Sequence, residues 1–180
     1  MTANLFDVLR ARRTIRRYTP EPVSDEDIDA LLEAAMYAPS RMDRRPWRFI
    51  VLRDQALQQE MADALGVRNY LAEAPALIVV CADPAASPTW MMDISAATEN
   101  LLLAAADRSL GAAWVGWPES AWWQPVEALL RRRIGVPDDI RVATVVAVGH
   151  PAEERAPYTR EERFDVTLIH DGRWGNKRLP

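Results

Sequence analysis

The N-terminal part of this chain concentrates positive charge that the rest of the sequence does not share. Five arginines fall within eight positions: Arg10, Arg12, Arg13, Arg16 and Arg17. The formal net charge of the 180-residue chain is nonetheless -4. Guanidinium groups bind phosphate and carboxylate through paired hydrogen bonds, and the hydroxyl of Thr14 adds a further donor. The cluster therefore predicts a site for one small anion, such as a phosphate monoester, rather than a nucleic-acid surface. The plainer alternative is a solvated helix end.

The sequence lacks the common catalytic signatures. It has no glycine-rich phosphate loop and no Gly-x-Ser-x-Gly nucleophile elbow. Its two histidines, His150 and His170, have no carboxylate or cysteine at metal-ligand spacing, so we expect no metal site. The single cysteine, Cys81, excludes an internal disulfide framework, and its apolar surroundings favour a buried, inert thiol. Such a chain either binds a ligand without chemistry or takes its chemistry from an organic cofactor.

The elements that must position these residues can be read from hydrophobic spacing. Apolar residues at helical spacing predict helices over residues 4–13, 55–65, 90–110 and 119–134, one more between Ser24 and Pro39, and a short helical stretch ending at Ala74. Strands are predicted over residues 47–52, 76–82, 112–116 and 141–148. Ser24 and Asp54 are expected helix N-caps, and residues 40–46 a polar loop. This order predicts a single α+β domain around a small mixed sheet.

The last segment, residues 150–180, differs from the rest. It carries charges, prolines and one short apolar patch, Val166 to Ile169. A segment of this length cannot form its own core, so we expect a tail that wraps over something, most simply a partner subunit. The long apolar helix 90–110 is expected at the centre of the core or of a subunit interface.

Two further features bear on location and ligand. No apolar run approaches the roughly 20 residues needed to span a bilayer, and the N-terminus lacks a signal-peptide layout, so we expect a cytoplasmic protein without membrane contact. Three tryptophans, Trp117, Trp122 and Trp123, lie close together in the sequence. They predict either core packing or an aromatic wall beside a planar ligand.

Four segments, taken in order, resemble the nitroreductase family of FMN-dependent oxidoreductases. They are residues 12–18, residues 38–49, the apolar stretch from Asn100 through Gly111 to Trp117, and residues 145–151, with Arg160 and Arg163 following. Each segment alone is a weak signal, but the order and intervals together are specific, and the resemblance covers nearly the whole chain.

The resemblance implies an α+β fold with a mixed sheet, flanked by helices, in an intertwined homodimer with two FMN sites at the interface. Position by position, it implies that Arg12, Arg13 and Thr14 hold the phosphate and ribityl chain, and that Arg16 reaches the pyrimidine edge. It implies a partner loop over the ring, made of Pro39, Ser40, Arg41, Met42 and Asp43. The turn of Val115, Gly116 and Trp117 would lie along the flavin with a backbone N–H toward N5. Arg163, or in its place Arg160, would complete the phosphate site.

The implied activity is hydride transfer from NADH or NADPH through FMN to an electron-poor small molecule, a nitroaromatic or a quinone, in two alternating half-reactions. Asp43 and Arg45 depart from the family, which usually has an asparagine and a glutamine in this loop. A carboxylate there would oppose a reduced flavin unless Arg44 or Arg45 pairs with it. Two alternatives follow: a flavoenzyme of the same fold with another reaction, such as dehydrogenation, dehalogenation or flavin consumption, or a non-catalytic binder of phosphate-bearing ligands.

Overall fold

A four-stranded sheet forms the centre of the molecule. The computed structural model describes residues 4–66 and 69–179; residues 1–3 and the start of the expected helical stretch before Ala74 lie outside that range. The strands follow the order β1-β2-β4-β3 and are β1 (Trp47–Leu52), β2 (Ala76–Ala82), β3 (Gly111–Val115) and β4 (Arg141–Gly149).

All three strand pairs in this sheet are antiparallel. The prediction of a mixed sheet is therefore wrong for these four strands, because β4 lies between β2 and β3. Strands β2 and β3 run in the same direction, but β4 inserts between them and reverses the direction at both contacts. In the described residues, parallel pairing is confined to an isolated bridge between Thr14 and Ala112.

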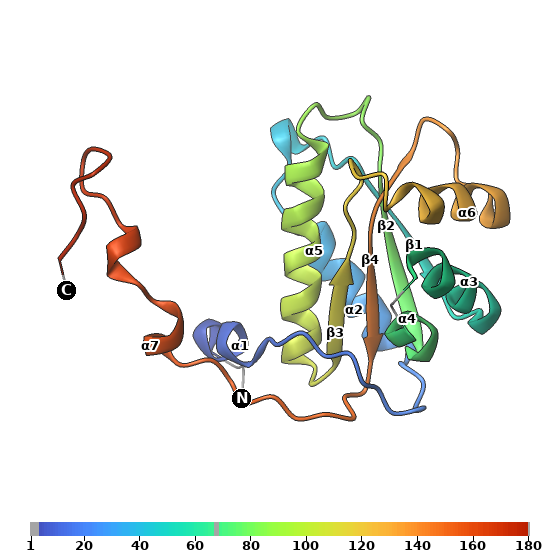
Figure 1. Cartoon of the computed structure of the whole chain (residues 1–180), viewed down its shortest axis with the longest axis horizontal. Helices are drawn as coiled ribbons and strands as arrows, with labels where there is room; N and C mark the ends of the chain where they lie inside the picture. The colour runs from blue at the N-terminus through green and yellow to red at the C-terminus, as the bar shows by residue number, and fades with distance from the viewer. Residues whose placement is uncertain (1–3, 67–68, 180) are drawn as a thin grey trace.

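Helices cover both faces of the sheet (Figure 1). One face carries α2 (Asp25–Met36) and α5 (Trp90–Asp107); the other carries α3 (Gln55–Leu65), α4 (Asn69–Glu73) and α6 (Gln124–Ile134). Strand β2 serves both cores, because side chains alternate along a strand. Leu77, Val79 and Cys81 join the core beneath α3 and α6, whereas Ile78 and Val80 join the core beneath α5. The prediction of a strand buried on both faces, with Cys81 inside, is confirmed.

Most of the predicted helix ends are confirmed by local hydrogen bonds. The Ser24 hydroxyl accepts from the amide of Asp27, and the Asp54 carboxylate accepts from the amides of Ala56 and Leu57. Three expected helices are shorter than predicted, and one of them is the helix expected over residues 90–110, which ends at Asp107. The first, α1 (Leu5–Ala11), stops before Thr14 because that residue pairs with the sheet edge. The helix expected from residue 119 begins only at Gln124, since turns occupy the residues before it.

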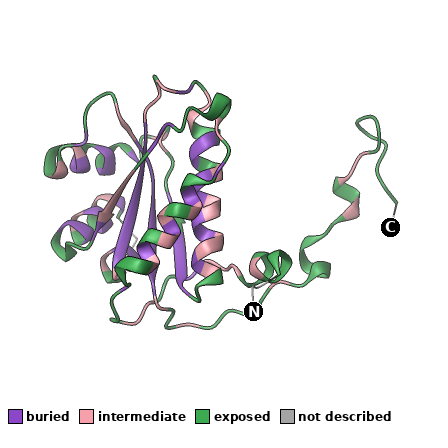
Figure 2. Ribbon diagram, turned by 180° about the vertical axis from the view of Figure 1, so that it is seen from behind, coloured by how far each residue is buried: buried purple, intermediate pink, exposed green. Residues whose placement is uncertain are grey.

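The segment after β4 leaves the body of the molecule (Figures 1 and 2). It passes α1, where the amide of Tyr158 donates to the carbonyl of Arg10 over 2.9 Å, and continues through α7 (Arg160–Arg163) and the turn η2 (Val166–Leu168). Its large apolar side chains are exposed: Phe164, Leu168, Trp174 and Leu179. The tail therefore does not cover the core of its own chain. Among the described residues, no helix combines the length and apolar character that crossing a bilayer requires.

Candidate functional site

The arginine segment runs along the open edge of the sheet. Beyond α1, Thr14 bridges Ala112 at the start of β3, and the amide of Ile15 donates to the Ala112 carbonyl over 3.0 Å. Ile15 is buried and lies so close to Gly111 that a Cβ there would stand 2.7 Å from its side chain. Backbone pairing and this close contact fix the segment, so its arginines extend from a rigid support.

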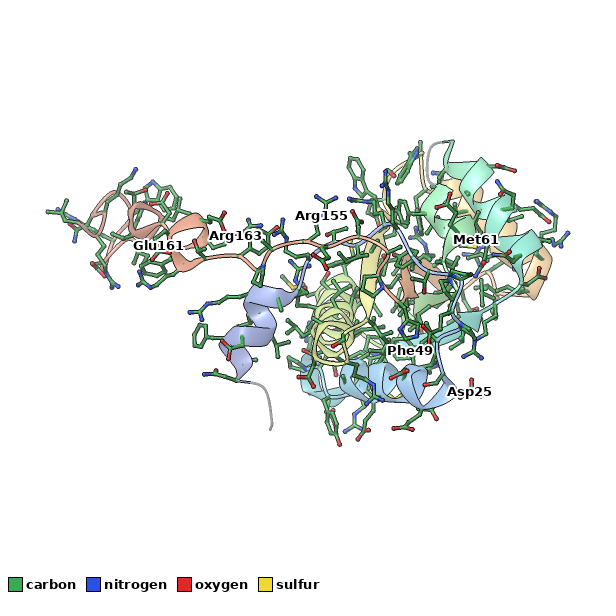
Figure 3. The ribbon with its side chains drawn as sticks, turned by 90° about the horizontal axis from the view of Figure 1, so that it is seen from below. Asp25, Phe49, Met61, Arg155, Glu161 and Arg163 are labelled. Atoms are coloured by element: carbon green, nitrogen blue, oxygen red, sulfur yellow. The ribbon has the colours of Figure 1, made fainter. Side chains whose placement is uncertain are left out.

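Arg13 and Arg163 meet at one aromatic ring. The guanidinium carbon of Arg13 lies 4.0 Å from the ring centroid of Tyr158, and that of Arg163 lies 3.6 Å from it. Arg13 also donates to the carbonyl of Ala156. Arg163 reaches this place from the projecting tail (Figure 3). Arg160 packs instead over Phe164, at 4.1 Å, so the structure associates Arg163 rather than Arg160 with Arg13.

The positive charge of this cluster lowers the pKa of the Tyr158 phenol. Desolvation raises the pKa of its phenol, but the nearby guanidinium groups of Arg13 and Arg163 lower it by more, so that the pKa falls below its ordinary value. Tyr158 was not expected from the sequence, because a tyrosine in a charged, proline-containing tail follows no hydrophobic spacing. Its role becomes visible only when the tail and the N-terminal segment lie side by side.

A pocket of about 630 Å³ opens beside this ring. Its polar wall contains Arg10, Arg12, Arg160 and Arg163 and a single carboxylate, Glu99, whose Oε1 lies 3.6 Å from Nε of Arg12. Its apolar wall comes from α1 and the tail, with Phe6, Leu9, Tyr158 and Phe164. Guanidinium groups in such excess repel one another until an anion compensates them. The residues present therefore fit a dianionic phosphate.

Arg16 lies apart from this group. It is exposed, its backbone amide donates to the Glu153 carboxylate over 2.8 Å, and its guanidinium carbon lies 5.6 Å from the ring of Tyr70. The buried Ile15 separates it from Arg13 along the chain. Arg16 is thus available for a different part of a ligand than the phosphate, as the resemblance implies.

The loop from Pro39 to Asp43 is anchored to the start of α5. The amide of Arg41 donates to Oδ1 of Asp93 over 3.2 Å, and the Ser87 hydroxyl donates to Oδ2 of the same carboxylate over 2.6 Å. Asp93 is buried, so these hydrogen bonds compensate its charge. Asp93 is the one charged residue in the first two turns of a mostly apolar helix, and this is the sequence signal that could have identified the anchor.

Asp43 is paired with Arg45 in a two-pronged contact. Nε and Nη2 of Arg45 lie 2.7 and 2.6 Å from the two carboxylate oxygens, and this contact lowers the pKa of the Asp43 carboxyl. The amide of Arg45 also donates to the Ser40 hydroxyl over 3.0 Å. Met42, Asp43 and Arg45 all have positive φ, so the loop backbone is strained. The charges of Asp43 and Arg45 neutralise each other, so the expected repulsion between the Asp43 carboxylate and a reduced flavin is removed.

The turn after β3 is held against β4. The Thr144 hydroxyl donates to the Val115 carbonyl over 2.6 Å. A Cβ on Gly116 would stand 2.7 Å from the carbonyl oxygen of Ala143 and 2.7 Å from Cα of Thr144. Glycine is therefore required at position 116 by β4 itself, independently of any ligand that lies beside the turn.

The three neighbouring tryptophans divide between core and surface. Trp123 is fully buried, and its indole N–H donates to the Val142 carbonyl over 2.7 Å. Trp117 is 64% exposed and Trp122 is 37% exposed. Core packing is thus correct for Trp123, whereas Trp117 remains free to border a planar ligand.

The expected site residues do not all meet within one chain. The Pro39–Asp43 loop is held at Asp93, in the first turn of α5, whereas Arg12 and Arg13 line a second pocket together with Ala106, near the other end of that helix. Asp93 and Ala106 are about 20 Å apart along the axis, since an α-helix rises 1.5 Å per residue. The part of the chain that the structure describes contains no cluster of histidine, cysteine and acidic residues that could hold a metal.

Comparison with known proteins places this arrangement in a family. The model of the nitroreductase family matches residues 9–70 and 66–150. A protein of Archaeoglobus fulgidus named "Putative NADH dehydrogenase/NAD(P)H nitroreductase" is 41% identical over 172 residues, which cover 93% of this chain and 97% of that protein.

Solved structures agree with the sequence comparison. A protein with the same name from Parabacteroides distasonis superposes with a TM-score of 0.86 at 36% identity, and the match covers 94% of this chain and 98% of that protein's chain. A "putative nitroreductase in complex with fmn" from Desulfovibrio desulfuricans has a TM-score of 0.75 at 30% identity, over 92% and 98% of the two chains. The chain belongs to the nitroreductase family.

Proposed function

We propose that this protein is an FMN-dependent NAD(P)H oxidoreductase. The observation that carries the proposal is the convergence of Arg12 and Arg163 on a pocket whose wall contains one carboxylate, Glu99, with Arg13 stacked on the Tyr158 ring that borders this pocket. Such a set of donors suits the phosphate of a flavin mononucleotide, which carries nearly two negative charges at neutral pH. A relative in complex with FMN supports the same choice of ligand.

The protein's own contributions are binding, orientation and electrostatics. Bound FMN would accept a hydride from NADH or NADPH and deliver it to an electron-poor acceptor, such as a nitroaromatic or a quinone. Arg12, Arg13 and Arg163 would bind the phosphate, with the Thr14 hydroxyl as a further donor. Arg16 would stabilise negative charge at the pyrimidine edge of the ring. No side chain need act as general acid, because solvent can deliver protons.

We propose further that two copies of the chain complete each site. The Pro39–Asp43 loop lies near one end of α5 and the arginine cluster near the other, so a loop over the ring would have to come from a second copy. The exposed apolar side chains of the tail, among them Phe164, Leu168 and Trp174, support the same view, because such side chains favour burial against a partner. Light scattering of the purified protein should therefore give the mass of a dimer.

The test of the proposed activity is the visible spectrum of the purified protein. Yellow protein should be bleached by NADH or NADPH without oxygen and should regain its colour when a nitroaromatic or a quinone is added. Colourless protein that does not take up added FMN would refute the proposal. Yellow protein that neither nucleotide bleaches would favour another reaction on the same fold. We also propose that the protein is cytoplasmic, which cell fractionation tests.

A further inference from the structure

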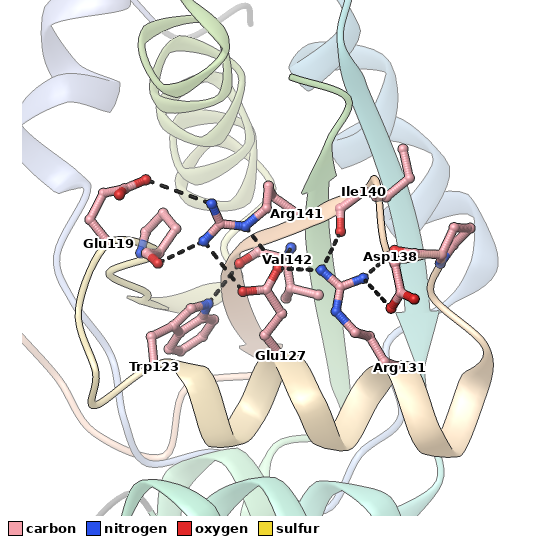
Figure 4. Close-up of polar contacts among 10 residues, drawn as sticks. Glu119, Trp123, Glu127, Arg131, Asp138, Ile140, Arg141 and Val142 are labelled. Carbon is pink, nitrogen blue, oxygen red and sulfur yellow. Dashed lines mark hydrogen bonds and ion pairs between the residues drawn. The ribbon is translucent and has the colours of Figure 1, made fainter. Parts of the chain in front are cut away.

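A buried carboxylate on α6 connects two turns of the molecule (Figure 4). Oε1 of Glu127 accepts from the amide of Val142 over 3.1 Å, from Nη2 of Arg131 over 2.8 Å and from Nε of Arg141 over 3.0 Å. Glu127 is only 7% exposed, so these donors compensate a charge that burial would otherwise disfavour. Both arginines therefore have one end fixed on the same atom.

The other ends of the two arginines reach different turns. Arg131 donates to the carbonyls of Pro137 and Ile140, in the turn between α6 and β4. Arg141 donates to the Pro118 carbonyl over 2.8 Å, and its Nη1 lies 3.8 Å from the Glu119 carboxylate. The chain thus contains a matched pair of arginines that differ in the turn they hold.

We propose that Arg141 is a positioning residue for the turn that presents Gly116 and Trp117 to the ligand, an inference that rests on the proposed function. Val115, before this turn, is held by Thr144, and Trp123, at its end, is held by Val142. Between them, no other hydrogen bond or ion pair among the described residues reaches Pro118 or Glu119 from outside the turn.

The same guanidinium also borders the start of α5. Its carbon lies 5.8 Å from the ring centroid of Trp90, three residues before the Asp93 that anchors the Pro39–Asp43 loop. Arg141 therefore contacts both the turn after β3 and the start of α5. Because small displacements of positioned groups lower reaction rates by up to about 100-fold, releasing this one contact should impair hydride transfer without removing the cofactor.

The experiment compares Arg141→Gln with Arg131→Gln in the full-length protein. Each variant removes one of the two arginines that contact Glu127, so both should lose stability, but only the first releases Pro118. Hydrogen exchange of the protein without cofactor should rise at least about tenfold in residues 116–120 for Arg141→Gln, and in residues 137–140 for Arg131→Gln. Equal exchange of residues 116–120 in the two variants would overturn the proposal. If Arg141→Gln does not fold, Arg141→Lys, which lacks the forked guanidinium, is judged by the same comparison.

A second readout uses the FMN-loaded protein. The limiting rate constant for flavin reduction should fall about tenfold or more in Arg141→Gln and less than about twofold in Arg131→Gln, while both bind FMN within about threefold of the unchanged protein. Equal rates in the two variants would also overturn the inference. If the unchanged protein takes up no FMN, the proposed function fails, and the hydrogen exchange comparison still decides whether Arg141 holds the turn.

Discussion

The replacement of Gly116 by alanine separates two explanations of why glycine stands there. A Cβ at this position would lie 2.6 Å from Oγ1 of Thr144, 2.7 Å from the Ala143 carbonyl oxygen and 2.7 Å from Cα of Thr144. The last two contacts involve β4 backbone, which cannot rotate away as a side chain can. Overpacking of this kind costs about 2–3 kcal/mol of unfolding free energy.

An opposing contribution comes from the unfolded chain. Gly116 does not have a positive φ, so alanine can adopt its backbone conformation. Restricting the unfolded chain then stabilises the protein by about 0.4–1 kcal/mol. The steric cost is larger, and the net loss is about 1–2.5 kcal/mol, or a fall in melting temperature of about 2–10 °C for a chain of this length.

The assay is thermal unfolding of the protein without cofactor. If glycine at position 116 served only the approach of a ligand, the alanine variant without ligand would be slightly more stable, so the two explanations predict opposite signs. The double variant with Thr144→Ala should recover little stability, because the contact with the Ala143 carbonyl persists. An unchanged or raised melting temperature in Gly116→Ala would refute the reasoning.

Three further outcomes are expected. Arg13→Glu should weaken FMN binding at least about tenfold, since a charged hydrogen bond contributes about 1.5–3 kcal/mol. Arg17→Glu changes the net charge by the same amount at an exposed side chain and should leave FMN binding unchanged. Equilibrium dialysis with FMN measures both affinities. Trp123→Phe should lower the unfolding free energy in urea by about 1–3 kcal/mol, because the buried Val142 carbonyl loses its donor; an unchanged midpoint would contradict this. Burial raises the pKa of the Cys81 thiol from 9.0 to about 12. Between these pH values the folded protein binds more protons than the unfolded chain, so the free energy of unfolding falls as pH rises. Urea titrations at pH 8 and pH 10 should therefore show a smaller loss of unfolding free energy in Cys81→Ala than in the unchanged protein.

The elements of the fold could largely be predicted from the sequence because local patterns determine them. Caps such as Ser24 and Asp54 act within one turn of their helices, and the continuous apolar run of β2 identifies a strand that faces two cores. The order of the strands could not be predicted in this way. Antiparallel pairing of β4 with both β2 and β3 joins residues that are distant in the sequence. Hydrophobic spacing predicts a strand, but it does not show which other strands lie beside it in the sheet.

The same division applies to the candidate site. The sequence by itself determined the family and the arginine segment, since residue types at fixed intervals are local features. Only the tertiary structure decided that Arg163 rather than Arg160 meets Arg13, through the ring of Tyr158, and that Arg45 compensates Asp43. It also showed that β4 leaves no room for a side chain at position 116. These properties depend on distances between atoms that the fold brings together, and spacing along a chain does not encode such distances.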